Sequence, residues 1–126
     1  MMLEFFEYDN NAGFSSVYES HVTFNKPLLK YFKDAYRVRL AVDRENKRAH
    51  IYVVNKDYAL SGELNEASLL NVSVSKTYAR VCSKPAVDYL FSVFGLTIEK
   101  QEFKRFKAKY DDEKKVIVIY MKGESE

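Results

Sequence analysis

The chain contains a long run of residues twice, and this repeat limits its possible folds more than any other feature. The segment Arg37–Tyr52 returns 68 positions later as Arg105–Tyr120, with charged and apolar residues at matching places. Upstream, Phe24–Phe32 returns as Cys82–Leu90, offset by 58 positions. A repeat of this length indicates one supersecondary unit used twice and packed about an approximate two-fold axis.

The expected organisation is a single domain over residues 1–126, a length sufficient for a hydrophobic core. We place the two repeats at about 14–54 and 71–122, joined by a linker at about 55–70. The predicted fold class is α+β. Two tandem strand–helix–hairpin repeats are expected to pack about a pseudo-two-fold axis as a mostly antiparallel sheet or a small barrel.

Each repeat is expected to contain a strand followed by a short helix. Val22 and Phe24 alternate with polar residues, which is typical of a half-buried strand. Asn25 and Ser83 each precede a Lys-Pro pair and are predicted to cap the helices, and Gly95 is predicted to end the second one. The expected buried stripes are Leu28, Tyr31 and Phe32 in the first helix, and Ala86, Tyr89, Leu90 and Phe94 in the second. Further strands are expected at residues 14–18 and 71–75.

A β-hairpin closes each repeat. Apolar residues alternate with basic ones along the first strand of both hairpins, which predicts one buried and one basic face. Asp43 and Asp111 stand at the turn entrances, where an aspartate accepts hydrogen bonds from backbone amides ahead of it. Val116–Ile119 is apolar throughout, so this return strand is expected to be more central than Ala49–Val54.

The single cysteine, Cys82, rules out an internal disulfide and is typical of a reducing compartment. Because Cys82 aligns with Phe24, we expect it to be buried in the core, with a reactive thiol as the alternative. No segment approaches the roughly 20 apolar residues that cross a membrane. Met1–Asp9 lacks the basic flank of a secretory signal. These observations favour a cytoplasmic protein without membrane contact.

The segment Val22–Phe32 resembles the SpoVT/AbrB swapped-hairpin unit of bacterial transition-state regulators and antitoxins. In that family an Ile-x-Ile strand leads into Pro-Lys-x-Ile and a Leu four residues on. Those places are taken here by Val22, Phe24, Lys26, Leu28 and Phe32. Tyr110–Ile119 resembles the family's closing hairpin, and two copies in one chain are similar to the duplicated MraZ-like proteins. The resemblance implies the fold above and DNA binding. The chain also resembles small uncharacterised proteins of bacterial mobile elements, which implies no activity.

The chain departs from this family at its DNA-contacting positions. The family has Gly-Arg before the first strand, an Arg on the short helix and a Pro at the strand end. In their places stand Ser20-His21 and Tyr78-Ala79, Leu29 and Val87, and Asn25 and Ser83. The resemblance therefore supports the fold more strongly than it supports DNA binding.

Basic residues on the strand faces and helices of both repeats suggest binding to double-stranded DNA. Two related basic faces suit two half-sites on a duplex, and Lys and Arg neutralise phosphates. The candidate contacts are Lys26, Lys30, Lys33, Arg37, Arg39, Arg80, Lys84, Arg105, Lys107 and Lys109. The competing interpretation is that exposed strand faces carry Lys and Arg only to keep sheet edges soluble.

The alternative function is a protein-interaction module that binds no nucleic acid. Ten Tyr and nine Phe favour it, because aromatic side chains anchor protein interfaces. Phe5, Phe6, Tyr8 and Phe14 are the candidate contacts, and packing on the chain's own core is the competing interpretation. The protein is either a monomer that acts as its own pseudo-dimer or a homo-oligomer.

The residue inventory argues against an enzyme, and we expect neither a cofactor nor a metal. His21 and His50 lie beside neither a Cys nor a carboxylate pair at metal-ligand spacing. Four Gly leave no glycine-rich phosphate loop. The acidic pairs recur at both hairpin turns, which favours a structural role. The predicted function is a non-enzymatic binding protein, with a DNA-binding regulator as the first hypothesis.

Overall fold

The computed structural model describes residues 2–5, 12–99 and 102–121. Within these ranges, the short segments of alternating apolar and polar residues fold into strands. The strands are β1 (Phe14–Tyr18), β2 (His21–Asn25), β3 (Arg37–Asp43), β4 (Arg48–Val54), β5 (Val72–Val74), β6 (Tyr78–Cys82), β7 (Phe103–Asp111) and β8 (Val116–Tyr120). The helices are α1 (Lys56–Ala59) and α2 (Lys84–Phe94), with 3-10 helices η1 (Lys26–Phe32) and η2 (Glu66–Ser68).

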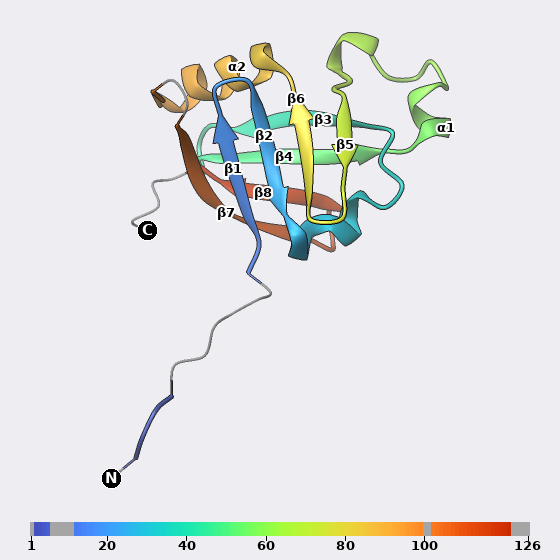
Figure 1. The fold of residues 1–126 in the computed structure, drawn as a ribbon. Helices are drawn as coiled ribbons and strands as arrows, with labels where there is room; N and C mark the ends of the chain where they lie inside the picture. The colour runs from blue at the N-terminus through green and yellow to red at the C-terminus, as the bar shows by residue number, and fades with distance from the viewer. Residues whose placement is uncertain (1, 6–11, 100–101, 122–126) are drawn as a thin grey trace.

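The described strands form one sheet in the order β3-β4-β8-β7-β1-β2-β6-β5, and all neighbouring pairs are antiparallel. Val38 on β3 and Leu70, just before β5, exchange two backbone hydrogen bonds of 3.0 and 2.8 Å. This bridge links the two ends of the strand order. The sheet therefore curls into a barrel-like shape, with β3 and β4 behind β1, β2 and β6 (Figure 1). A mostly antiparallel α+β fold was predicted and is confirmed at this level.

The core lies inside the curled sheet and is covered at opposite ends by α2 and η1 (Figure 1). Phe24 on β2 is fully buried and packs 5.1 Å, between ring centres, from Phe32 of η1. From α2, Val87 and Leu90 are buried. Each large apolar side chain moved out of water in this way stabilises the fold by about 1.5–3 kcal/mol.

Strand β8 is the most completely buried strand. Val116, Ile117, Val118 and Ile119 are all buried, whereas β4 has exposed residues at Arg48 and Tyr52. The prediction that the second return strand is the more central of the two is confirmed.

The two hairpins are equivalent residue by residue. Asp43 pairs with Arg48, and 68 positions later Asp111 pairs with Val116; the next three pairs keep the same offset. Lys47 and Lys115 both have φ of 56°, the left-handed conformation at the end of each turn. Asp43 accepts from the Asn46 amide at 3.1 Å, and Asp111 accepts from the Lys114 amide at 3.1 Å. The aspartates hold the turns as predicted.

The capping predictions hold for the second helix and fail for the first. Ser83 Oγ accepts from the Ala86 amide at 3.2 Å, and Gly95 ends α2 with φ of 64°. Asn25 makes no side-chain capping bond. Its side chain instead accepts from the Phe14 amide and donates to the Ala12 carbonyl, both at 2.9 Å, and so fixes the start of β1.

Two predictions of burial are wrong. Cys82 is exposed, because Ala79 and Val81 are the inward residues of β6 and Cys82 falls on the opposite face. The offset of 58 residues between the repeats aligns the helices correctly. In the strands before them the inward residues are offset by 57, because Phe24 of β2 corresponds to Val81 of β6. Tyr89 is 45% exposed, since α2 turns Val87 and Leu90 toward the core instead.

The start of the chain was predicted to dock on the core or on a partner. Phe5 is 79% exposed, so it does not dock on the core. Phe6 and Tyr8 lie outside the described residues. Contact between Phe5 and a partner stays a prediction.

Candidate nucleic-acid interface

The outward face of four neighbouring strands is basic and aromatic. Ser15 and Val17 of β1, and Phe106 and Ala108 of β7, point inward, so the alternate positions point out. The outward residues are Phe103, Arg105, Lys107 and Lys109 on β7; Phe14, Ser16 and Tyr18 on β1; His21, Thr23 and Asn25 on β2; and Tyr78, Arg80 and Cys82 on β6. None of these positions holds a carboxylate.

Two arginines stand at opposite ends of one cross-strand row. Arg105 pairs with Ser16, Ser16 with Thr23, and Thr23 with Arg80. The row crosses three strand spacings, or about 14 Å. Two hydroxyl side chains therefore lie between two guanidinium groups.

A second row, two residues along the strands, brings three rings together. The Tyr18 and His21 rings stack with centres 4.4 Å apart and planes at 13°, and the Tyr18 and Phe103 rings lie 5.0 Å apart. Phe103 is 50% exposed. We call Tyr18, His21 and Phe103 the aromatic cluster.

His21 is held in its neutral form at neutral pH. Burial, and secondarily the positive charge of Arg80, lower the pKa of His21 below its ordinary value of 6.5. The imidazole that stacks on Tyr18 is therefore mainly uncharged at neutral pH.

Within the residues that the structure describes, the two arginines of the row have no carboxylate partner. Lys84–Asp88 is the one ion pair among the described residues. The Arg105 guanidinium carbon lies 3.9 Å from the centre of the Phe14 ring, which orients the side chain across β1. Nε of Arg80 is buried and has no hydrogen-bond partner in the described part of the chain. Among the described residues, therefore, no carboxylate neutralises either guanidinium group.

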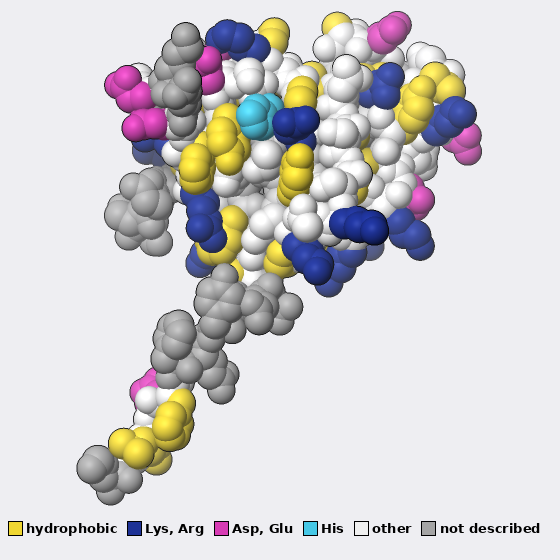
Figure 2. Space-filling model, viewed as in Figure 1, with side chains coloured by type: hydrophobic (Ala, Val, Ile, Leu, Met, Phe, Trp, Pro, Cys, Tyr) yellow, Lys and Arg dark blue, Asp and Glu magenta, His cyan; other side chains and the backbone are white. Residues whose placement is uncertain are grey.

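Shallow hollows follow this face. One, of about 310 Å³, is lined by the aromatic rings of Tyr18, His21 and Tyr78 together with Arg80. Its neighbour, of about 250 Å³, is lined by Phe14, Phe103, Arg105 and Tyr78 among others. Figure 2 shows hydrophobic and basic side chains alternating along β6, where Tyr78, Arg80 and Cys82 point outward.

Three lysines meet where η1 approaches β7. Lys30, Lys107 and Lys109 line a hollow of about 470 Å³. Beside them Tyr31 stacks on Tyr110, with ring centres 3.9 Å apart and planes at 6°. We call Lys30, Arg80, Arg105, Lys107 and Lys109 the basic band.

The other five predicted cations lie elsewhere. Lys26 and Lys33 are exposed on and just after η1. Lys84, on α2, pairs with Asp88 at 3.2 Å. Arg37 and Arg39 lie on β3, which β4 and β8 separate from β7.

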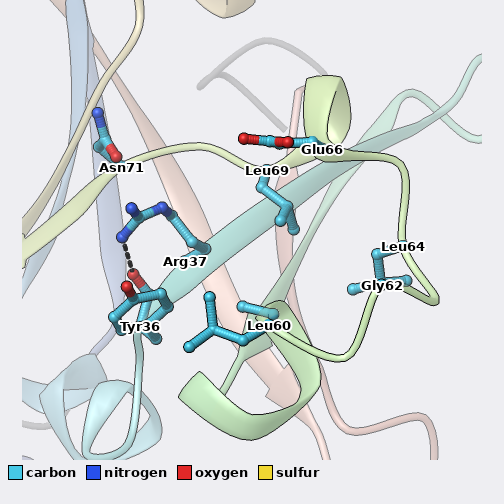
Figure 3. A pocket seen from close by; sticks show the side chains of 9 residues that line it. Tyr36, Arg37, Leu60, Gly62, Leu64, Glu66, Leu69 and Asn71 are labelled. Carbon is cyan, nitrogen blue, oxygen red and sulfur yellow. Dashed lines mark hydrogen bonds between the residues drawn. The ribbon is translucent and has the colours of Figure 1, made fainter.

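Both β3 arginines are engaged locally. Nη1 of Arg37 donates to the Tyr36 carbonyl at 2.8 Å, and its guanidinium lies 4.4 Å from the Tyr36 ring centre (Figure 3). This pair borders a hollow of about 470 Å³ under the segment that carries α1 and η2. Nε of Arg39 donates to Ser68 Oγ at 3.2 Å. The basic faces of β3 and β7 therefore do not form one continuous surface.

The aromatic cluster was not among the predicted site residues. Phe14 was considered only as a protein contact, and Tyr18, His21, Tyr78 and Phe103 were not singled out for binding. The sequence signal that could have identified these residues is their spacing of two, because residues two apart in a strand lie on the same face. Phe103 and Arg105 share one face of β7, and Tyr78 and Arg80 share one face of β6. The pairing of β7 with β1 joins these faces, and no local pattern predicts that pairing.

No protein-family model, curated protein or solved structure matches this chain. Across the described residues there is no group of three or more His, Cys, Asp or Glu placed to hold a metal ion. None of the helices in the described ranges is long and apolar enough to cross a membrane.

Proposed function

We propose that this protein binds nucleic acid through the basic band and the aromatic residues beside it, and that it catalyses no reaction. The observation that carries the proposal is the continuity of the basic band: Lys30 of η1 lines one hollow with Lys107 and Lys109 of β7, and Arg80 of β6 lies in the cross-strand row of Arg105. Among the described residues, no outward position of β7, β1, β2 or β6 holds a carboxylate. Phosphates are the polyanions that such a face neutralises best.

The solubility interpretation fits this face poorly. Lys and Arg protect exposed sheet edges, where unpaired backbone groups invite aggregation. Strands β7, β1, β2 and β6 each have hydrogen-bonded neighbours on both sides. Edge protection therefore does not account for Arg105, Lys107, Lys109 and Arg80.

We also propose that the chain is a tandem duplication about a pseudo-two-fold axis, as in the SpoVT/AbrB-like proteins it resembles. Support comes from the equivalent hairpins and from the strand order. The Val38–Leu70 bridge joins the two ends of the strand order, so the strands form a closed circle. If β1, β2, β3 and β4 are exchanged with β5, β6, β7 and β8 respectively, every strand in this circle keeps the same neighbours. The basic band lies on one face of the duplicated fold, which favours a single binding site over two equivalent half-sites.

A protein-interaction module remains the second candidate function. Leu3 and Phe5 are 68% and 79% exposed, and such side chains suit burial in an interface. A Phe5→Ser variant separates the two functions, because it removes an apolar contact and leaves the basic band unchanged.

The test is a titration of the full chain with generic duplex and single-stranded DNA at low and moderate salt. Binding at low salt is expected to weaken with salt. If all five band cations contact phosphates, the slope of log K against log salt is about −3.5 to −4.5. Absence of binding to both DNA forms at low salt would refute the proposal.

A further inference from the structure

We propose that the nucleic acid on this face is a single strand, whose bases stack on the aromatic cluster while the basic band contacts its phosphates. The inference rests on the proposed function and narrows it to one ligand class. It replaces the duplex that was expected from two related basic faces, since those faces are not continuous here.

Exposed aromatic rings beside the arginines favour a single strand over a duplex as the ligand. Phe103 is 50% exposed and Tyr78 is 40% exposed, and both stand beside arginines on the outward face. In a duplex the faces of the bases are covered by their neighbours, so these rings would meet only sugar and phosphate. A single strand presents base faces that stack on aromatic side chains whatever the sequence.

The spacing of the two rows fits one strand. The aromatic row of Phe103, Tyr18 and His21 lies two residues along the strands from the row that ends in Arg105 and Arg80. Two residues of a strand span about 7 Å. The phosphate and the base of one nucleotide are separated by a distance of this order, so neighbouring rows receive different parts of the same ligand.

The cluster is also prepared for stacking. Tyr18 is sandwiched between His21 and Phe103, so the three rings are held before a ligand arrives. The lowered pKa of His21 favours the uncharged imidazole beside Tyr18 at neutral pH. Ordering these side chains in advance reduces the entropy lost on binding.

The test compares three ligands of the full chain by fluorescence competition: a mixed-sequence single-stranded 20-mer, the same sequence as a duplex, and inorganic polyphosphate, which has charge but no bases. The variants are Phe103→Ala and Phe103→Leu; the second keeps an apolar side chain if the first fails to fold. Tyr52→Leu is the matched control, because Tyr52 is an exposed aromatic on β4, away from the band.

The expected result is tighter binding of the single strand than of the duplex. Removing the Phe103 ring is expected to weaken single-strand binding about 5- to 100-fold and to leave polyphosphate binding unchanged. Tyr52→Leu is expected to change neither. Equal or tighter duplex binding, or a single-strand affinity that Phe103→Leu leaves intact, overturns the inference while the proposed function stands. If neither DNA form binds, both this inference and the proposed function are overturned.

Discussion

Arg105 and Phe14 form a diagonal cation–π pair across two strands, with the guanidinium carbon 3.9 Å from the ring centre. In the β7–β1 register Arg105 is opposite Ser16, and Phe14 is opposite Lys107. The ring therefore reaches along the sheet to hold the neighbouring arginine. An arginine held in this way loses less side-chain entropy when it binds a phosphate.

Replacing Phe14 by Leu should weaken nucleic-acid binding without changing any charge. An exposed cation–π pair contributes about 0.5–1 kcal/mol, so the expected loss in affinity is about 2- to 5-fold. Fluorescence anisotropy at constant salt measures it. Tyr120→Leu is the control, because it removes the Arg48–Tyr120 pair outside the band. An equal loss in both variants would mean that the pair has no specific role.

The bridge that joins the ends of the sheet should be visible in amide exchange. Val38 donates to the Leu70 carbonyl at 3.0 Å. The amides of Leu40 and Val42 point to the same side of β3, where no described strand continues the pairing. We expect slower hydrogen exchange at Val38 than at Leu40 and Val42, measured by NMR. Similar rates at all three amides would show that the sheet is open at this point.

The two hairpin turns should respond alike to glycine. Lys47 and Lys115 both adopt φ of 56°, which strains a residue with a Cβ. Lys47→Gly and Lys115→Gly are each expected to stabilise the protein by about 0.5–1 kcal/mol, since the relief of strain exceeds the added freedom of the unfolded chain. Urea unfolding gives the values. Lys114→Gly, in the same turn without a positive φ, is the control and should not stabilise; opposite signs at 47 and 115 would refute the equivalence.

Protonation of His21 should lower the free energy of unfolding in mild acid. Its pKa is lowered in the folded protein, so the unfolded chain binds the proton more readily. The stability that the neutral imidazole contributes is therefore fully present above about pH 6.5 and is lost as pH falls toward the lowered pKa of the folded state. Urea unfolding at pH 7 and pH 5.5 tests this, with His21→Gln expected to show a smaller decrease. An unchanged decrease in the variant would assign it to other groups.

Local sequence predicted the elements better than their arrangement. Residues 14–18, the hairpins and the cap at Ser83 were recognisable because alternation, turn aspartates and capping depend on near neighbours. The first cap was not, since Asn25 bonds Phe14 and Ala12, which are distant in sequence. The exposure of Cys82 followed from a shift of one residue, which reverses the face of every side chain in a strand.

The candidate site was predicted only in part for the same reason. The cations of β7 were identified from their alternation along one strand. Their separation from Arg37 and Arg39 depends on the strand order, which places β4 and β8 between them. The aromatic cluster depends on the pairing of β7 with β1, a contact between residues about 85 positions apart. Side-chain pattern alone does not determine such long-range pairings.

Charge reversal on two strands tests the central claim most directly. Arg105→Glu/Lys107→Glu and Arg37→Glu/Arg39→Glu change the net charge equally, but only the first pair lies in the basic band. Titration with single-stranded DNA over a range of salt concentrations is expected to show at least a tenfold loss in affinity for the β7 variant, with a salt slope shallower by about 1.4, and little change for the β3 variant. Equal losses in both variants, with both folded by circular dichroism, would contradict a binding site on the band.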